Sequence, residues 1–453
     1  MSKISDIVLI YPYFNPRIDT STFRTPPLGL GYIASYIRKN GFSVDIIDCT
    51  FMSWKEATES VKAANPSIIG VYSMFSMAEE SVKFARLFRN KCELLVAGGP
   101  LPTVNPDFFL NYFDLVVRGE GEQTFLEIVK AFFNKDTFSN IQGVIYRNGG
   151  NTVYNDRRQP FRDLDILPFP ARDLFPNKDY VKYWRRRFKP AKTSIITTRG
   201  CPFDCDFCSH AVFGVSYRER SAENVVDEIE EALKLGYSSI FFVDDCFTLN
   251  KERVERICSG ILERGLKFEW ECLSRVDNVT LELVTKMKQA GCARMFFGIE
   301  SGNEEMLKII GKRFTLGQAR KTVETASAAG IKTGAFFILG YPGETDETLL
   351  DTIEFSTSLP LDYLSFTMPY PIPGTGLYEK VKSNLITNDL RRSRFGIIDH
   401  SLVYKSQYSS AKLKFAIVKG SFEFRVRKHL GQYSWIILKP FKKVTDYILK
   451  KMS

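Results

Sequence analysis

The chain has 453 residues, of which 44% are hydrophobic and 25% are charged, and its net charge is +10. This length allows two or three domains with cores of their own, and the composition excludes a disordered or fibrous protein. No apolar run reaches the roughly 20 residues of a bilayer-spanning helix, and the first apolar run lacks the form of a secretory signal. We therefore expect a cytoplasmic protein without a transmembrane segment, whose cysteines are mostly reduced.

Apolar strands and amphipathic helices alternate over residues 1–150. The predicted strands cover residues 6–10, 43–47, 67–71, 93–97 and 114–117, and the predicted helices cover 31–39, 53–64, 78–88 and 122–133. This alternation predicts a doubly wound, Rossmann-like parallel sheet. Such sheets bind ligands at the carboxyl ends of their strands.

Glycine-rich loops follow the strands at that edge of the predicted sheet. Glycines let the backbone approach a ligand closely, and helix N-termini favour phosphate groups. No GxGxxG motif stands in the place that a dinucleotide fold requires, which disfavours a nicotinamide or flavin cofactor. The candidate ligand-contacting residues in these loops are Pro27, Leu28, Gly29, Gly31, Ser73, Met74, Gly98, Gly99, Glu120 and Gly121.

Residues 151–190 are rich in proline, and we expect a linker that wraps around the protein without packing into it.

A second alternation of apolar strands and amphipathic helices fills residues 191–380. Its predicted strands cover residues 194–198, 239–243, 268–272, 294–299, 333–339 and 363–367, and its predicted helices cover 222–234, 252–263, 281–289, 316–328 and 345–358. Six strand–helix repeats predict a partial (β/α)6 TIM barrel with its site at the carboxyl ends of the strands.

A cysteine loop leaves the first predicted strand of this barrel. Cys201, Cys205 and Cys208 are spaced CxxxCxxC. A [4Fe–4S] cluster takes four thiolates, so three would leave one iron open to a substrate or cofactor. A structural zinc site is the alternative, because His210 could complete a four-ligand set. The position of the loop at a barrel strand end favours a catalytic cluster.

These motifs resemble those of radical S-adenosylmethionine (SAM) enzymes. The CxxxCxxC loop with an aromatic residue before its last cysteine is similar to the family signature, and the motifs at residues 242–245, 272–277, 297–302 and 340–345 strengthen the likeness. The motifs at residues 26–31, 98–100 and 118–122 resemble those of the subfamily with a cobalamin-binding domain. The resemblance covers about residues 1–380 and implies domains at 1–150 (cobalamin) and 191–380 (radical SAM).

The resemblance implies the cofactors and the residues that hold them. Cys201, Cys205 and Cys208 would ligate the [4Fe–4S] cluster and carry catalysis, and SAM would chelate the open iron. The glycine-rich loops of the first domain would hold cobalamin. That domain lacks a DxHxxG motif, so we expect water or a non-histidine group from residues 72–77 on the lower face of the cobalt. The implied SAM-binding residues are Phe207, Asp244, Arg275, Glu300 and Gly340.

The family further implies a C-methyltransferase. One SAM would yield a 5′-deoxyadenosyl radical that abstracts hydrogen from an unactivated carbon, which would receive the methyl group of methylcobalamin. The substrate could be a peptide or protein side chain, as in methyl-coenzyme M reductase, or a lipid or natural-product precursor. A radical enzyme that cyclises or rearranges its substrate and a non-catalytic cobalamin or redox sensor are the alternatives. A small electron donor such as ferredoxin or flavodoxin is the implied partner.

Residues 381–453 combine basic and aromatic residues and hold few motifs. A helix is expected over residues 444–451, and we predict a small, mostly helical region. Four interpretations stay open for its basic face: contact with an anionic membrane, contact with an acidic protein, contact with nucleic acid, and a solvated helical cap on the barrel. Of these, nucleic acid is not expected as a partner.

Overall fold

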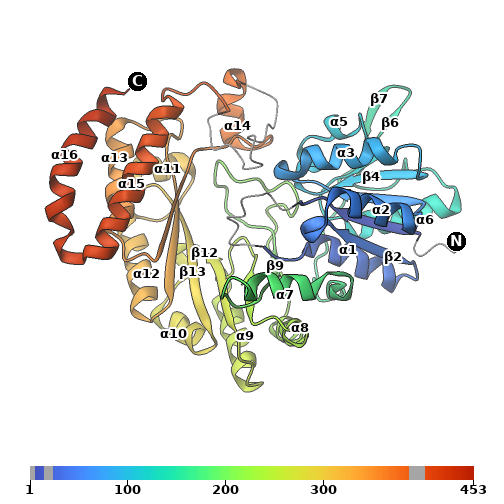
Figure 1. Ribbon diagram of the computed structural model, residues 1–453, viewed down its shortest axis with the longest axis horizontal. Helices are drawn as coiled ribbons and strands as arrows, with labels where there is room; N and C mark the ends of the chain where they lie inside the picture. The colour runs from blue at the N-terminus through green and yellow to red at the C-terminus, as the bar shows by residue number, and fades with distance from the viewer. Residues whose placement is uncertain (1–5, 15–23, 387–402, 453) are drawn as a thin grey trace.

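The computed structural model describes residues 6–14, 24–386 and 403–452. Two large β-sheets lie side by side, the first near the N-terminus and the second in the middle of the chain, and two long helices cover the far side of the second sheet (Figure 1). This arrangement confirms the predicted order of a doubly wound sheet, a partial barrel and a helical C-terminal region. Among the described residues, no helix combines the length and apolarity needed to cross a bilayer.

The first sheet has the strand order β2-β1-β3-β4-β5-β6-β7, and β1 to β5 are parallel. Because β1 pairs with both β2 and β3, the winding direction reverses between β1 and β3, and a ligand crevice is expected there. The strands are β1 (Ile7–Tyr11), β2 (Val44–Asp48), β3 (Ile68–Tyr72), β4 (Leu94–Gly98), β5 (Leu115–Val117), β6 (Val144–Asn148) and β7 (Asn151–Tyr154).

Helices cover both faces of this sheet and bury two separate apolar clusters. One face carries α1 (Leu28–Lys39) and α6 (Glu122–Asn134), whose apolar stripes meet the strands. The other face carries α2 (Trp54–Ala64), α3 (Ala78–Phe88), α4 (Pro100–Val104) and α5 (Pro106–Phe109). The start of α2 is fixed by a reciprocal capping box between Ser53 and Glu56.

The antiparallel hairpin of β6 and β7 was not predicted from the sequence. Its two strands join through Gly149 and Gly150, which both adopt positive φ. The outer residues of the hairpin are polar and exposed, so the segment lacks the apolar run that marked the parallel strands. The hairpin covers the β5 edge of the sheet, which would otherwise present unpaired backbone groups.

The second sheet is parallel throughout, with its strands in the order β15-β14-β13-β12-β11-β8. The strands are β8 (Lys192–Ile195), β11 (Ser239–Phe242), β12 (Glu269–Ser274), β13 (Cys292–Glu300), β14 (Lys332–Ile338) and β15 (Tyr363–Thr367). The helices are α8 (Ala222–Lys234), α9 (Lys251–Glu263), α10 (Leu281–Gln289), α11 (Glu304–Ile310), α12 (Leu316–Ala328) and α13 (Asp346–Ser358). A short pair, β9 (Thr198–Arg199) and β10 (Arg218–Glu219), brackets the cysteine loop.

The linker packs more than its proline content predicts. It contains α7 (Asn177–Arg185), and Tyr180 and Trp184 of this helix are fully buried. The hydroxyl of Tyr180 donates to Asp48 at 2.7 Å, and the indole N–H of Trp184 donates to the carbonyl of Arg24 at 3.0 Å. The expectation of a wrapping segment was wrong here, because two large aromatic rings bury enough surface to hold a two-turn helix against the first sheet.

In the described part of the chain after β15, the α-helices are α14 (Gly376–Val381), α15 (Ser410–Leu430) and α16 (Trp435–Lys451). Helix α15 packs against α13 and β15, and α16 packs against α15. Leu413 and Ala416 of α15 join a core with Leu339 and Tyr341 from the end of β14. The helical region is therefore attached to the same end of the second sheet that carries the cysteine loop.

Candidate active site between the two sheets

A cavity of about 390 Å³ opens at the carboxyl ends of the first sheet. Tyr11 ends β1, Tyr72 ends β3 and Gly98 ends β4, and all three line this cavity. The two tyrosine rings lie 5.6 Å apart between centroids. The cavity therefore sits at the point where the winding of the sheet reverses, as expected for the ligand site of such a sheet.

The second sheet supplies the opposite wall of the same cavity. Ser194 and Ile196 come from the end of β8, Val243 follows β11, and Val212 and Phe213 belong to the segment that returns from the cysteine loop. A ligand in this cavity would thus contact the first sheet on one side and the surroundings of the cysteine loop on the other.

Most of the predicted cobalamin-contacting residues line this cavity. Pro27, Leu28, Gly29, Gly98, Gly99, Glu120 and Gly121 do so. Gly31, Ser73 and Met74 lie off its wall. A Cβ on Gly31 would stand 2.7 Å from the ring of Phe175, so this glycine serves the packing of the linker on α1. Met74 is exposed, and Ser73 is fully buried with its hydroxyl left without a partner among the described residues.

The donor set of the cysteine loop fits an iron–sulfur cluster. Cys201, Cys205 and Cys208 are half-buried and free. Burial, followed by the charges of Asp245 and the other two cysteines, raises the pKa of Cys208 to about 12. Within the described residues, no set of three or more His, Cys, Asp and Glu side chains converges on a single point, and this holds for the three cysteines with or without His210. The position of the loop at a barrel strand end, and not the distances between side chains, is what favours a catalytic cluster over zinc.

Backbone and side-chain contacts of Asp206 hold the cysteine loop in place on three sides. The Asp206 N–H donates to the carbonyl of Ile310 at 2.9 Å, and the Leu377 N–H donates to the carbonyl of Asp206 at 2.9 Å. The Asp206 carboxylate accepts from the hydroxyl of Tyr341 and from Lys380, the latter at 2.9 Å. The loop is thereby tied to α11, α14 and the end of β14, which together fix where its thiols point.

Gly200 is required by the turn that opens the loop. Its φ is +82°, and a Cβ there would stand 2.2 Å from the carbonyl oxygen of Ser216. We expect Gly200→Ala to displace the loop and lower the iron content of the reconstituted protein severalfold, because both the backbone conformation and the clash oppose the side chain. Iron and sulfide analysis checks this. Gly149→Ala is the matched control, since Gly149 also has positive φ but open space around it.

Arg275 lies directly beside the cysteine loop. Its guanidinium is 3.6 Å from the ring centroid of Phe203, and its Nε and Nη2 donate to both carboxylate oxygens of Asp277 at 3.0 and 2.8 Å. Its side chain is largely buried. The bidentate pair with Asp277 orients the guanidinium, which suits recognition of a carboxylate by its remaining edge.

Glu300 forms a buried pair with Lys312, a residue that no sequence motif marked. The Lys312 Nζ lies 3.3 Å from the Glu300 carboxylate, 2.9 Å from the carbonyl of Gly298 and 5.7 Å from the ring centroid of Phe207. Burial raises the pKa of Glu300 and Lys312 opposes that rise. Glu300 also adopts φ of +76° beside a register shift in β13, a conformation that stores strain at functional positions.

Asp244 and Gly340 occupy interior positions. The Asp244 carboxylate accepts from the backbone N–H groups of Thr197 and Thr198 at 2.5 and 3.0 Å, and the residue is fully buried. It therefore shapes the strand that leads into the cysteine loop. A Cβ on Gly340 would stand 2.5 Å from Leu413, so this glycine admits α15 against the end of β14.

Glu344 follows Gly340 and is buried with an unusual proton affinity. Burial raises the pKa of its carboxyl to about 8, and backbone N–H groups of Gly340 and Tyr341 oppose that rise. The folded state therefore holds a proton that the unfolded chain releases at about pH 4.3. The stability that the protonated Glu344 contributes is fully present below its unfolded pKa and is lost as the pH rises through its folded pKa of about 8.

We expect Glu344→Gln to flatten this pH dependence. Between about pH 5 and about pH 8, the free energy of unfolding of the wild type should fall more steeply than that of the variant. Urea unfolding at several pH values measures this dependence of the free energy of unfolding on pH. Glu347→Gln, an exposed change at the start of α13, should leave the wild-type slope in place. Equal slopes for Glu344→Gln and the wild type would contradict the assignment.

An ion-pair network that was not predicted from the sequence joins the two sheets at the cavity. Arg199, the residue before Gly200, bonds Glu120 at 2.7 Å and Glu122 at 2.6 Å, and Arg218 bonds Glu120 at 2.6 Å. All four side chains are almost fully buried. The sequence signal that could have indicated this network is the pair Glu120 and Glu122 shortly after β5, together with Arg199 two residues before the first cysteine.

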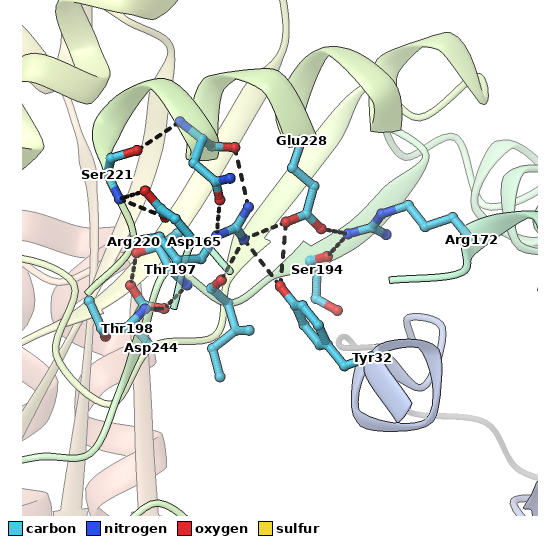
Figure 2. Close-up of polar contacts among 12 residues, drawn as sticks. Tyr32, Asp165, Arg172, Ser194, Thr197, Thr198, Arg220, Ser221, Glu228 and Asp244 are labelled. Atoms are coloured by element: carbon cyan, nitrogen blue, oxygen red, sulfur yellow. Dashed lines mark hydrogen bonds and ion pairs between the residues drawn. The ribbon is translucent and has the colours of Figure 1, made fainter. Parts of the chain in front are cut away.

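A second buried network lies where α8 meets α1 and the linker (Figure 2). Glu228 of α8 bonds Arg172 of the linker at 2.6 Å and also pairs with Arg220. The hydroxyl of Tyr32, from α1, lies 3.1 Å from Arg220 and 3.5 Å from Glu228. One carboxylate thus connects three separate segments of the chain, which fixes the first sheet against the barrel.

A parallel partial barrel with a cysteine loop at its first strand, placed behind a doubly wound sheet, is the architecture of a radical SAM enzyme with a cobalamin-binding domain. Two family models agree with this. The radical SAM superfamily model matches residues 195–356, and the B12 binding domain model matches residues 15–129.

Curated relatives and solved structures extend the match. An uncharacterized methyltransferase of Pyrococcus horikoshii is 33% identical over 94% of this chain and 93% of its own. The hopanoid C-3 methylase of Methylococcus capsulatus is 26% identical over 83% of this chain and 73% of its own. The cobalamin-dependent radical enzyme OxsB, with aqua-cobalamin and SAM bound, has a TM-score of 0.75 at 19% identity, over 98% of this chain and 72% of its own.

The chain belongs to the cobalamin-binding radical SAM enzymes and is a radical SAM methyltransferase. Its cofactors are a [4Fe–4S] cluster, SAM and cobalamin.

Proposed function

We propose that the protein methylates an unactivated carbon of its substrate. The observation that supports this most strongly is the shared cavity, whose walls come from the predicted cobalamin loops on one side and from the segment around the cysteine loop on the other. A reacting carbon held there would be within reach of both cofactors. Methyl transfer to a carbon radical needs that proximity, because the radical must meet the methyl group before it meets solvent.

When bound, the cluster with SAM supplies a hydrogen-abstracting radical and cobalamin supplies the methyl group. The protein's part is to hold and orient them. Cys201, Cys205 and Cys208 would ligate the cluster through their thiolates. Arg275 would bind the SAM carboxylate, since Asp277 already fixes its orientation.

Of the remaining residues of the proposed SAM site, Glu300 and Phe207 would contact SAM itself. Asp244 and Gly340 act by positioning other parts of the chain. Glu300 would accept from the SAM amino or ribose groups, with Lys312 holding its carboxylate. Phe207 would contact the adenine. Asp244 positions the strand before the cysteine loop, and Gly340 lets α15 close over the end of β14. Electrons would come from a small donor such as ferredoxin or flavodoxin.

The substrate class is tested by isotope labelling. Reconstituted enzyme is incubated anaerobically with reductant, SAM that carries a CD3 group, and either the lipid or the peptide fraction of cells that lack the protein. We expect a product that retains the intact CD3 group, formed together with 5′-deoxyadenosine. A changed but unlabelled product would instead show cyclisation or rearrangement. Labelled product without 5′-deoxyadenosine would contradict hydrogen abstraction, and the fraction that gains the label identifies the substrate as lipid or peptide.

A further inference from the structure

Almost all of the net charge of the protein lies in its last two helices. Residues 410–453 contain eleven lysines and arginines against Glu423 and Asp446, a net charge of +9 in a chain whose total is +10. Helix α16 is the outermost element on the side of the molecule away from the first sheet (Figure 1). The charge on α16 therefore lies on the opposite side of the molecule from the first sheet, and the residues that line the cavity between the sheets include none from α16.

The cations of this region fall into two groups. Those on the inner side are paired: Lys419 bonds Glu423 and Asp446, Lys412 bonds Asp346 at 2.8 Å, and Arg427 bonds Glu354 at 2.6 Å. A second group is exposed and has no carboxylate partner within the described ranges: Lys414, Arg425, Lys439 and Lys443. The paired cations hold the helices on the barrel, and the exposed ones leave their charge available to a partner.

Helix α16 carries a stripe of large apolar side chains that faces solvent. Ile436, Val444 and Tyr447 are 57%, 57% and 65% exposed, and Ile437 and Ile448 are exposed beside them. Ile436 and Ile437 lie eight and seven residues before Val444, about two helical turns, and Tyr447 and Ile448 lie three and four residues after it. This spacing places all five on one side of the helix. The opposite side is used for packing, since Leu438, Thr445 and Leu449 are buried. The exposed stripe is thus a second apolar face and has no partner in the described chain.

Lysines and interfacial aromatic residues border this stripe. Lys439 and Lys443 are four residues apart and form a row along one edge of it. Trp435 and Tyr433 are exposed at its start, and Phe422 of α15 packs on Phe441 at 4.5 Å between ring centroids beside it. Apolar side chains bordered by lysines, with Trp and Tyr at the margin, are the features of a helix that lies in the surface of a bilayer.

We propose that the exposed face of α16, together with Val418 and Phe422 of α15, docks the enzyme on an anionic lipid membrane. The apolar stripe enters the boundary between headgroups and acyl chains, and the unpaired cations contact anionic headgroups. The charge complementarity selects a membrane over a second copy of this chain, whose matching face would carry the same positive charge and repel it. Docking of this kind does not depend on which atom is methylated.

Vesicle sedimentation with the full-length holoenzyme tests the docking. Vesicles of phosphatidylcholine alone are compared with vesicles that also contain phosphatidylglycerol. We expect binding to the anionic vesicles that weakens as salt is added. The apolar variant (Ile436→Ser, Val444→Ser and Tyr447→Ser) and the charge variant (Lys439→Glu and Lys443→Glu) should each weaken it about tenfold or more. Both variants should retain 5′-deoxyadenosine formation, which shows that they fold.

The matched control places serine at two exposed leucines elsewhere, Leu262 on α9 and Leu281 on α10, and should bind like the wild type. Three results would overturn the proposal. The first is equal binding of all variants to anionic vesicles, or no binding by the wild type. The second is a dimer in sedimentation velocity that the apolar variant dissociates, which would assign the face to a second copy. The third is tight binding of duplex DNA in place of vesicles, lost in the charge variant alone.

Discussion

Replacing Cys205 by alanine is expected to reduce 5′-deoxyadenosine formation to the level of a protein-free control. The variant would leave two thiolates for a cluster that needs three from the protein, so SAM would lose the iron to which it binds. The half-buried position of Cys205 leaves space for alanine, and the loop keeps its contacts with α11 and α14 through the backbone of Asp206. We therefore expect a folded protein without activity, measured by iron analysis and by chromatography of the nucleoside product.

Cys92→Ser is the control for this experiment. Cys92 is also free and partly buried, but it precedes β4 in the first sheet and hydrogen-bonds only to backbone carbonyls among the described residues. The control should keep its cluster and its full activity. A Cys205→Ala protein that still cleaved SAM at the wild-type rate would contradict the assignment of the cluster to this loop.

Replacing Glu228 by glutamine is expected to lower the free energy of unfolding by about 3–5 kcal/mol, because two buried guanidinium groups would lose their shared counter-charge. Glu228 and Arg172 are both almost fully buried in the network of Figure 2. The change is nearly isosteric, so the loss would report charge and not packing. Urea unfolding followed by circular dichroism measures it.

The pH dependence of this variant gives a second readout. Burial by itself would raise the pKa of Glu228, but Arg220 and Arg172 together hold it below its ordinary value. The stability that this group contributes is therefore present above the unfolded pKa and is lost as pH falls through the lower, folded pKa. Acid should cost the variant less stability than the wild type. Glu231→Gln, an exposed change on the same helix, should shift stability by about 0.5 kcal/mol or less.

The sequence predicted the elements whose pattern is local. Strands such as β1 and β3 are continuous apolar runs because parallel strands are buried on both faces. The cysteine loop was recognised from its spacing together with its position after the first barrel strand. The hairpin of β6 and β7 was missed because its outer residues are polar. Helix α7 was missed because the prolines around it suggest a loop. The burial of Tyr180 and Trp184 depends on a cluster with Phe51 after β2 and with Ala191 and Tyr237 before strands of the second sheet, which forms only when the chain is folded.

The residues of the candidate site also fall into those that a local sequence pattern predicted and those that depend on contacts between distant segments. Glycine-rich loops at strand ends pointed to most of the cavity wall. Gly31 lies in one of these loops and was predicted to contact the ligand, but the absence of a side chain there makes room for the ring of Phe175. The pairs of Arg199 with Glu120 and Glu122 join residues more than 75 positions apart, and that of Glu300 with Lys312 crosses from β13 to the segment after α11. Such contacts depend on how helices and strands from distant parts of the chain pack together, and the sequence of one segment does not predict that packing.

The cluster and cobalamin are expected to face one cavity between the two sheets. Electron paramagnetic resonance of protein loaded with both cofactors, with the cluster reduced and cobalt in its paramagnetic Co(II) state, tests this most directly. Protein loaded with cobalamin alone provides the reference spectrum. We predict that the cobalt signal of the doubly loaded protein is split or broadened by the nearby cluster. A cobalt spectrum identical to the reference, in protein shown by analysis to hold both cofactors, would contradict the shared cavity.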